Sequence, residues 1–417
     1  MIKNLLTATA LLVSFSILCL GHGLQSVLLP ARGAMFEHYP NMTTGAMMSV
    51  YYIGFIIGTF ICPLLIGRVG HIRVFAASAA CASTIMLCHA LLPDPFIWIG
   101  LRAIYGFCMV HLYTVMESWL NSIGDLKSRG KILSVYMIIN FLAMSSGQLL
   151  FFVAPVNGFE LFSISAIMLS LSIVPLMVSS SVQPSIIKTP EFFGIKQLFK
   201  ISPLGVVGAM TAGLMAGAYW GLTSVFILRM GYAQEAIAWF MSASLVGGLL
   251  VQWPLGVISD RINRRYVIIL AATLVFIPSV ILSLMALWDS PSELFGIWWL
   301  VAIGAFFGAG FHPLYSLCIA HANDFIEPEH LVRASSGLQF VQGMGAIVGP
   351  LIAGVLMYLG GYAMLFLYIG ALAALFILYT LQRMAEGRKP AEGMSMPFRL
   401  LTRMGIITFF ADPRYRN

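Results

Sequence analysis

Charged residues are scarce in this chain. Of its 417 residues only 9% are Asp, Glu, Lys or Arg, whereas about a quarter is usual in a soluble globular protein. Hydrophobic residues make up 59%, and the mean hydropathy is +0.91 over the whole length. This composition excludes a disordered chain, a secreted scaffold and a soluble domain with a single anchor. It indicates a protein that crosses the membrane many times.

Signatures of soluble enzymes are also lacking. The six cysteines lie in apolar stretches without a C-x-x-C pair, and no histidines are grouped at metal-ligand spacing. No G-x-x-x-x-G-K-[ST] motif is present, which excludes a P-loop ATPase within the chain. Gly343, Gly345 and Gly349 superficially resemble a dinucleotide loop, but they fall in an apolar stretch where close helix packing is the better interpretation. We therefore expect no enzymatic activity, cofactor or metal.

Apolar stretches of membrane-spanning length, about 20 residues each, recur along the chain in two sets of six. We expect an all-α integral membrane protein with twelve transmembrane helices in two pseudo-symmetric six-helix bundles. The bundles cover residues 1–182 and 201–382, with a cytoplasmic linker at 183–200 and a basic cytoplasmic tail at 383–417. The predicted spans are 5–29, 44–66, 72–92, 96–120, 132–154, 159–180, 202–228, 235–257, 266–287, 294–320, 335–359 and 362–382.

The distribution of Lys and Arg predicts the orientation of these helices. Cytoplasmic loops retain positive charge. If the amino terminus lies inside, all but three of the 23 Lys and Arg residues fall on the inner side, the exceptions being Arg32, Arg102 and Arg229. We expect a multi-pass protein of the plasma (inner) membrane, in contact with lipid and monomeric, with both termini in the cytoplasm. The net charge of +7 then needs no nucleic-acid partner.

The two sets of six stretches share short patterns in the same order. The segment from Arg68 to Arg73 matches Asp260 to Arg265, and Leu-Tyr-Thr around Tyr113 matches Leu-Tyr-Ser around Tyr315. A third match joins Asp125-x-x-x-Arg129 to Glu329-x-x-x-Arg333. Together they predict an internal repeat, which is a usual construction for secondary transporters.

One loop carries the most specific motif. It reads Gly256-Val-Ile-Ser-Asp260-Arg261-Ile-Asn-Arg264-Arg265 and resembles the signature G-x-x-x-D-R-x-G-R-[RK] of the major facilitator superfamily. Arg102-x-x-x-Gly106 and the segment Gly345 to Gly354 resemble two further motifs of that superfamily, and the likeness extends over the chain up to the tail. The segment Glu117-Ser-Trp-Leu-Asn121 is similar to the YcaD-like group of bacterial facilitators. In helix five, Ser145-Ser-Gly-Gln148 departs from the glycine-proline motif of many antiporters, which disfavours a drug antiporter.

The resemblance implies transport of a small organic solute by alternating access, with the substrate site between the bundles and with proton coupling. It also implies a conformational latch that closes the inner side in the outward-facing state. Its residues are Gly256, Asp260, Arg261, Arg264 and Arg265.

The residue types of this latch suit such a role. Asp260 can accept hydrogen bonds from a neighbouring helix amino terminus, and the arginines can pair with carboxylates such as Glu117 or Asp125. In the first half Gly67 takes the place of the acid, so we expect an asymmetric latch. There Arg68 is interpreted as a cytoplasmic anchor.

Ionisable side chains inside an apolar span are functional candidates because hydrocarbon strongly disfavours charge. At about 100° per residue, one face of the fourth span carries Arg102, Gly106, Met109, Tyr113 and Glu117. This face is expected to line the transport pathway, either with a cation and an acid on opposite sides of a substrate or with a proton site at Glu117. The alternative is an Arg102 that snorkels to the outer interface and a Glu117 at the cytoplasmic rim.

Further polar side chains of the spans suit a polar organic ligand. His22 is the candidate for proton coupling, because an imidazole changes charge near neutral pH. For each of them the alternative is hydrogen-bonded helix packing. The other candidates are Gln25, Asn140 and Gln148 in the first half, and their counterparts Tyr219, Trp220, Gln252, His312, Tyr315, Gln339 and Gln342 in the second.

Two alternatives to a proton-coupled transporter stay open at this point. A facilitator without proton coupling agrees with the scarcity of acids within the spans. A membrane-embedded sensor would respond to a ligand without moving it, although the chain shows no soluble signalling domain. Neither the direction of transport nor the substrate follows from the residues.

Overall fold

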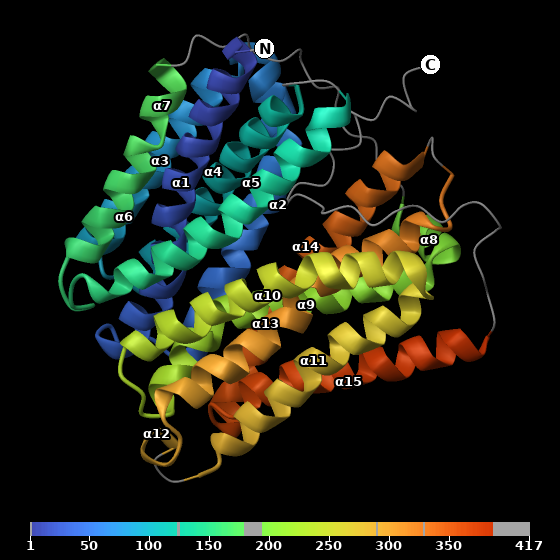
Figure 1. Ribbon diagram of the computed structural model, residues 1–417. Coiled ribbons are helices and arrows are strands. Elements are labelled where there is room, and N and C mark those ends of the chain that lie inside the picture. Colours follow the sequence, from blue (N-terminus) through green and yellow to red (C-terminus); the bar gives the residue numbers. More distant parts are fainter. Residues whose placement is uncertain (1, 123–125, 179–193, 289–290, 328–329, 387–417) are drawn as a thin grey trace. The chain divides into compact units, whose positions relative to one another are not determined.

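The computed structural model describes residues 2–122, 126–178, 194–288, 291–327 and 330–386 (Figure 1). Within these ranges the chain is helical and contains no strand. The helices are α1 (Ile2–Met35), α2 (Asn41–Val69), α3 (His71–Leu91), α4 (Pro95–Ser122), α5 (Leu126–Leu149), the 3-10 helix η1 (Leu150–Phe152), α6 (Glu160–Leu171), α7 (Ile173–Val178), α8 (Ile195–Ile201), α9 (Pro203–Arg229), α10 (Glu235–Arg261), α11 (Arg264–Met285), α12 (Pro291–Leu294), α13 (Ile297–Asn323), α14 (Leu331–Gly360) and α15 (Met364–Ala385).

Twelve segments of the described chain are long and apolar enough to cross a membrane, which confirms the predicted number. They are α1 to α5, with η1 completing the fifth, then α6 with α7, and α9, α10, α11, α13, α14 and α15. α8 begins in the predicted linker, where no helix was expected, and ends one residue beyond it. It packs through the buried side chain of Leu198. Residues 183–193 of that linker and 387–417 of the predicted tail lie outside the described residues.

The described chain forms two compact units. Unit 1 comprises residues 2–32 and 50–178, and unit 2 comprises residues 33–49 and 194–386. The end of α1 and the first turns of α2 therefore cluster with unit 2, although they fall within the first predicted bundle. The bundle boundaries themselves stay predictions, since 179–193 are outside the described residues.

Glycine allows close helix crossings in unit 1. A Cβ atom at Gly23 of α1 would lie within 3.0 Å of the Met144 carbonyl oxygen of α5, and one at Gly54 of α2 would be equally close to the Ala103 carbonyl of α4. Without such side chains the helix backbones can approach directly, as is common in membranes. The first helix of unit 1 thus packs on the fifth, and the second on the fourth.

Unit 2 repeats this pairing. A Cβ atom at Gly213 of α9 would clash with the Gln342 carbonyl of α14, and one at Gly308 of α13 with the Ser244 carbonyl of α10. Counted along the second set of spans, these pairs are again the first with the fifth and the second with the fourth. The predicted repeat is therefore visible in the helix packing of the two units.

The glycines with the superficial dinucleotide pattern serve the same purpose. In α14, Gly345 and Gly349 lie against the carbonyl oxygens of Met210 and Leu214 of α9. A nucleotide loop would leave the backbone open for a phosphate, whereas here it is covered by a second helix. The helix-packing interpretation is confirmed.

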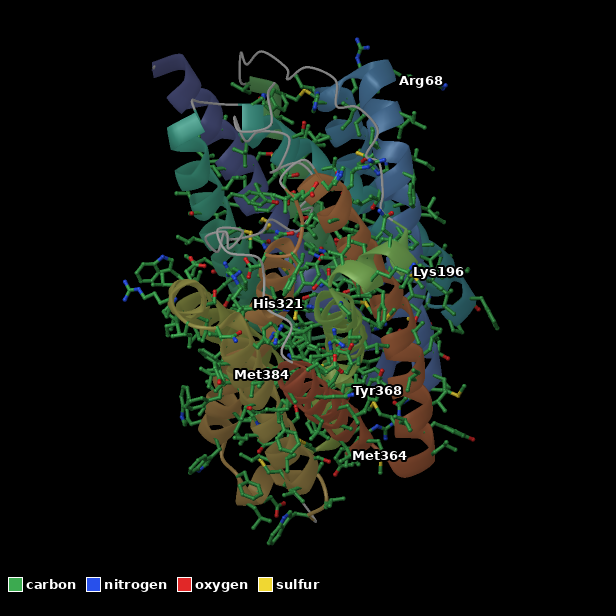
Figure 2. The ribbon with its side chains drawn as sticks, turned by 90° about the vertical axis from the view of Figure 1, so that its right-hand side faces the viewer. Arg68, Lys196, His321, Met364, Tyr368 and Met384 are labelled. Carbon is green, nitrogen blue, oxygen red and sulfur yellow. The ribbon has the colours of Figure 1, made fainter. Side chains whose placement is uncertain are left out.

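Large apolar side chains cover the outside of the helices. Phe96, Trp253 and Trp298 are among those exposed, and many more side chains project outward in Figure 2. In water an apolar surface of this extent would cause aggregation. Its natural surrounding is lipid hydrocarbon, and helices are suited to it because they satisfy their backbone hydrogen bonds internally.

Candidate functional site

Arg102 lies in the interior of unit 1. Its side chain is 7% exposed, and its guanidinium carbon is 4.6 Å from the ring centre of Tyr51 of α2 and 5.7 Å from that of Tyr105 of α4. Both distances are in the range of cation–π attraction. This position argues against a snorkelling arginine at the outer interface. Periodicity could have suggested Tyr105, three residues along the same helix, but nothing in the sequence points to Tyr51.

His22 connects α1 to the same cluster. Its Nδ1 atom lies 3.2 Å from the hydroxyl oxygen of Tyr105, and the two rings are stacked with centroids 5.9 Å apart. The edge of Tyr113 contacts it at 6.3 Å. The structure therefore brings together three candidates, His22, Arg102 and Tyr113, through a tyrosine that sequence reasoning missed.

Glu117 lies near the other end of α4 and is fully buried. It accepts a hydrogen bond of 3.0 Å from the hydroxyl of Tyr136 of α5. The Tyr136 ring stacks on Phe15 of α1, with centroids 4.3 Å apart, and Phe15 in turn contacts Tyr113. A continuous set of aromatic contacts thus leads from Glu117 to His22. Full burial disagrees with the interpretation of Glu117 as a residue of an exposed rim.

Arg102 and Glu117 mark two different places in unit 1. They are 15 residues apart on one continuous helix, which corresponds to about 22 Å at a rise of 1.5 Å per residue. This separation favours separate roles for the two residues. The hypothesis that a cation and an acid flank one substrate stays a prediction.

The candidate amides of α1 and α5 differ in their surroundings. Asn140 Oδ1 accepts a hydrogen bond from the thiol of Cys19, and Gln148 Nε2 donates to Ser26 Oγ, each at 3.5 Å. These contacts join α1 to α5, as expected for hydrogen-bonded helix packing. Gln25 is 1% exposed, and its Nε2 atom meets no acceptor among the described residues.

In unit 2 an aromatic cluster joins three of the candidates. Tyr219 of α9 stacks on Phe307 of α13 with ring centroids 5.2 Å apart, and it contacts the edge of Trp220. Trp220 lies 6.4 Å from the ring of His312, which also approaches Ser244 Oγ at 3.3 Å. Tyr219, Trp220 and His312 are therefore neighbours.

The other candidates of unit 2 differ in burial. Gln252 of α10 is buried, whereas Tyr315 of α13 and both glutamines of α14, Gln339 and Gln342, are half-buried. The ring and hydrogen-bond contacts that define the cluster do not include Gln252, Tyr315 or Gln342. Their assignment to a pathway stays a prediction.

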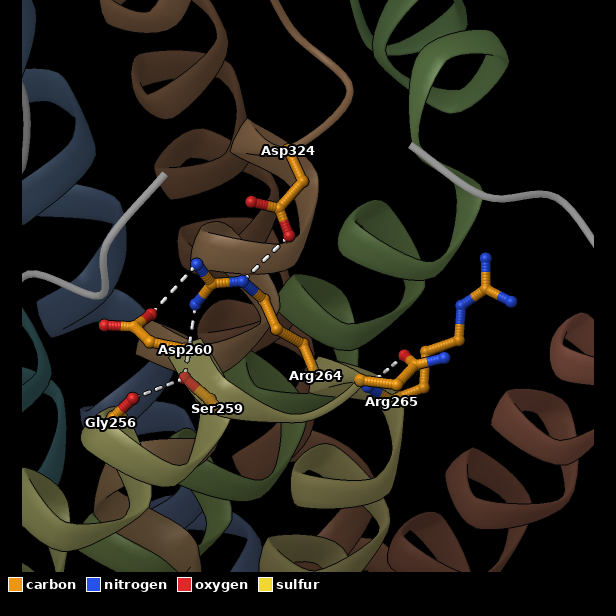
Figure 3. Close-up of polar contacts among 7 residues, drawn as sticks. Gly256, Ser259, Asp260, Arg264, Arg265 and Asp324 are labelled. Carbon is orange, nitrogen blue, oxygen red and sulfur yellow. Dashed lines mark hydrogen bonds and ion pairs between the residues drawn. The ribbon is translucent and has the colours of Figure 1, made fainter. Parts of the chain in front are cut away.

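The predicted latch residues form a charged network within unit 2 (Figure 3). Arg264 is buried, and its Nε atom donates to Asp324 at 2.8 Å. Its Nη2 atom pairs with Asp260 at 3.1 Å, and its Nη1 atom donates to Ser259 Oγ at 3.2 Å. Sequence reasoning missed Asp324, which comes directly after α13 and 60 residues from Arg264. A salt bridge over that separation leaves no local pattern.

The departure of this loop from the superfamily motif has a structural role. Asn263, which stands where the motif has glycine, accepts a hydrogen bond from the backbone N–H of Arg265 and so caps α11. Asparagine is among the best residues at this position. The Arg265 side chain donates to the carbonyl of Arg383 at the end of α15, at 3.3 Å.

The remaining latch residues, Gly256 and Arg261, are not part of the salt-bridge network around Arg264. The Gly256 carbonyl accepts from Ser259 Oγ at 2.7 Å, and Arg261 is exposed. The predicted pairing of the arginines with Glu117 or Asp125 stays a prediction, and Asp125 lies outside the described residues.

Unit 1 has an uncharged contact at the corresponding place. When Gly67 is aligned with Asp260, His71 aligns with Arg264. His71 is buried, and its Nε2 atom lies 3.1 Å from Ser118 Oγ. Arg68 is exposed at the end of α2, where Figure 2 shows it pointing outward. The difference between a charged network in unit 2 and a hydroxyl contact in unit 1 agrees with the expected asymmetry.

The sequence is similar to a known family of transporters and to bacterial members of it. A family model described as "Major Facilitator Superfamily" matches residues 11–291 and 205–413. The chain is 26% identical over 384 residues to the "Uncharacterized MFS-type transporter YcaD" of Salmonella heidelberg (strain SL476), covering 91% of this chain and 96% of the relative. It is 25% identical over 356 residues to the "Uncharacterized MFS-type transporter YE1530" of Yersinia enterocolitica, covering 85% and 90%.

Solved structures share the fold at low sequence identity. The nucleoside transporter NupG is 14% identical, with a TM-score of 0.73 over 93% of this chain and 100% of that structure. A bacterial homologue of the human lysosomal transporter Spinster, in an inward-facing and unoccupied conformation, is 13% identical, with a TM-score of 0.71 over 93% and 99%. These likenesses confirm the predicted twelve-helix fold.

Proposed function

The chain belongs to the Major Facilitator Superfamily, and from this premise we propose that it is a secondary active transporter of a small organic solute. Alternating access is the mechanism usual for folds built from two six-helix repeats. The matching helix pairs of the two units, first with fifth and second with fourth, support a repeat of this kind. A membrane-embedded sensor is disfavoured by membership in a family of transporters.

The observation that carries the proposal is the buried polar face of α4. Arg102, Tyr113 and Glu117 all lie in the interior of unit 1, and His22 of α1 joins them through Tyr105. Placing ionisable groups within a membrane protein is costly, and such groups are kept where a solute or a proton passes. A purely structural helix would have apolar residues at these positions.

Proton coupling is the finer part of the proposal. Glu117 is the one fully buried carboxylate of the described chain, and it accepts a hydrogen bond from the Tyr136 hydroxyl. A carboxyl group that gains and loses a proton during the cycle would couple the proton gradient to solute movement. His22 is a second candidate for this role.

An uncoupled facilitator is the alternative that one observation favours. Glu117 and Asp324 are the buried carboxylates of the described residues, and Asp324 is engaged with Arg264. Glu117 is then the one buried carboxylate left to carry a proton in the described residues, and this scarcity favours a transporter without proton coupling. The two mechanisms differ in whether the solute is concentrated against its gradient.

We further propose that the protein is a monomer in the bacterial inner membrane with both termini in the cytoplasm. The retention of Lys and Arg on one side of the spans supports this orientation. In that orientation, the network around Arg264 lies at the cytoplasmic ends of α10 and α13. It is the proposed latch of the outward-facing state.

The proposal can be tested before the substrate is known. Everted and right-side-out membrane vesicles, with and without the overexpressed protein, are incubated with a metabolite extract, and solutes inside are measured by mass spectrometry. We expect at least one solute whose accumulation depends on the protein and collapses with a protonophore. Accumulation in everted vesicles indicates export, and accumulation in right-side-out vesicles indicates uptake.

Other outcomes have defined meanings. Solutes that equilibrate faster with the protein, but are never concentrated, would support the facilitator. Vesicles in which the protein moves nothing in either orientation would contradict the transport function for every solute of the extract.

A further inference from the structure

Hydrogen-bond donors gather at one level of unit 1. Arg102 contributes a buried guanidinium group next to the rings of Tyr51 and Tyr105. Gln25 contributes a buried amide nitrogen that meets no acceptor among the described residues. A buried donor without an acceptor destabilises the fold, so it is expected where a ligand supplies the missing acceptor.

The helix geometry relates these two donors. His22 of α1 contacts Tyr105 of α4 directly. Gln25 follows His22 by three residues, and Arg102 precedes Tyr105 by three residues. Because α1 and α4 are first and fourth among successive spans, they cross the membrane in opposite directions. Three residues correspond to about 4.5 Å along a helix. Gln25 and Arg102 are therefore displaced by the same distance, and in the same direction across the membrane, from the His22–Tyr105 contact.

The chemistry of this level is that of an anion site. An arginine can hold a carboxylate through two parallel hydrogen bonds, and an amide nitrogen offers two further N–H groups. The neighbouring tyrosine rings offer flat apolar surfaces to the rest of a ligand.

We propose that unit 1 binds the carboxylate of an organic anion at Arg102 and Gln25, with the apolar body of the anion against Tyr51 and Tyr105. This inference rests on the proposed transport function, because it names the chemical class of the solute that is carried. A solute with a primary ammonium group is repelled by Arg102. A neutral amide of the same shape forms weaker hydrogen bonds with the same donors.

The test measures binding, so that it does not depend on flux. Purified full-length protein in lipid nanodiscs is titrated with radiolabelled benzoate and hexanoate in a scintillation proximity assay. We expect saturable binding that is displaced by either carboxylate. Benzamide, hexanamide and benzylamine should compete at least about tenfold more weakly, since hydrogen bonds between charged partners are about twice as strong as neutral ones. Competition by the amides or the amine at equal concentration would overturn the proposal.

Two variants of Arg102 and a control locate the site. Arg102→Gln should lower benzoate affinity at least about tenfold, and Arg102→Lys should retain part of it, because the charge remains while the bidentate geometry is lost. Arg73→Gln removes an exposed arginine of the same unit and should leave the affinity unchanged. Equal binding by Arg102→Gln and by the wild type would place the anion elsewhere and contradict the proposal.

A substitution at Gln25 tests whether a carboxylate of the protein itself can occupy the proposed anion site. Gln25→Glu puts a carboxylate where the anion is expected, so benzoate binding should disappear while the melting temperature stays equal or rises. If Gln25 does not face Arg102, the new buried acid has no cation to pair with. The melting temperature then falls and the Arg102-dependent binding remains, which would overturn the proposed geometry.

The outcomes separate this inference from the transport function. Arg102-dependent benzoate binding without any flux in vesicles would uphold the anion site and contradict transport. Protein-dependent flux of a cation or neutral solute, with no benzoate or hexanoate binding, would uphold transport and overturn the anion site.

Discussion

Among single residues, the buried Arg102 and Glu117 of α4 meet their partners Tyr51 and Tyr136 on other helices. The polar face of α4 follows from spacing alone, and His22 stands out as an imidazole in an apolar span. Tyr51 and Asp324 reach Arg102 and Arg264 from other helices, and no local pattern indicates such a meeting. Sequence therefore identified the ionisable groups, and the structure supplied the partners that set their chemistry.

The role of Glu117 in coupling is tested by removing its charge. We expect Glu117→Gln to abolish concentrative transport and to leave equilibration intact, because the amide cannot carry a proton. A gradient of one pH unit corresponds to about 1.4 kcal/mol, or about a tenfold solute ratio for one coupled proton. The measurement is the accumulation, in proteoliposomes with an imposed pH gradient, of a solute found in the vesicle experiment.

A matched control exists for this substitution. Glu160→Gln removes an exposed carboxylate of the same unit and should accumulate solute as the wild type does. If the Glu117→Gln variant still accumulates solute, Glu117 does not couple transport to protons. His22 of α1 would then be the next candidate.

The two acids of the latch should differ in their effect on stability. Asp324 has a side chain 5% exposed, and that of Asp260 is 31% exposed. Asp324→Asn removes the buried acid partner of Arg264, and breaking a buried pair lowers the free energy of unfolding by about 3–5 kcal/mol. Asp260→Asn should cost much less, because water replaces the lost contact. Thermal unfolding of both variants in one detergent makes the comparison, and equal losses would contradict this account.

Asp260→Asn should act on conformation instead. If Asp260 belongs to a latch of the outward-facing state, the variant should shift the protein away from that state. Labelling of single cysteines from the two sides of the membrane measures the shift. Unchanged labelling on both sides would leave Asp260 as an anchor of Arg264 only.

At the scale of helices, the spans could be predicted from apolar length, because the membrane thickness fixes the length that each needs. The pairing of the helices could not, because glycines are common in membrane helices and only some of them face a neighbour. Gly54 and Gly308 lie at crossings, whereas Gly100 of α4 has open space around the position of a Cβ atom. The short α8 escaped prediction because its sequence resembles a polar connection.

This difference between glycines gives a direct test of the crossings. Gly54→Ala should disrupt the α2–α4 contact and lower the yield and melting temperature of the folded protein, because the added methyl group meets the Ala103 carbonyl. Gly100→Ala should be neutral or should stabilise the protein by about 0.5–1 kcal/mol, since alanine is the better helix former. Equal melting temperatures for the two variants would show that the α2–α4 crossing is looser than described.

At the scale of the whole molecule, the distribution of Lys and Arg sets the orientation. With the amino terminus inside, the connection between α3 and α4 faces outward and the carboxyl terminus faces the cytoplasm. Alkaline phosphatase fused after Asp94 should therefore be active, and a phosphatase fused after Asn417 inactive. A green fluorescent protein at Asn417 should fluoresce. The reverse pattern of activities would show that the amino terminus lies outside, and that the Arg264 network faces the outside of the cell.

The central claim is that the protein carries its solute by alternating access, and entrance counterflow tests it most directly. Proteoliposomes loaded with an unlabelled metabolite extract are diluted into a trace of the same extract labelled with ¹³C, without a pH gradient. A carrier exchanges internal for external solute, so the labelled substrate should rise transiently above its equilibrium level and then fall. Label that enters without this overshoot, or not at all while the liposomes contain folded protein, would contradict the account.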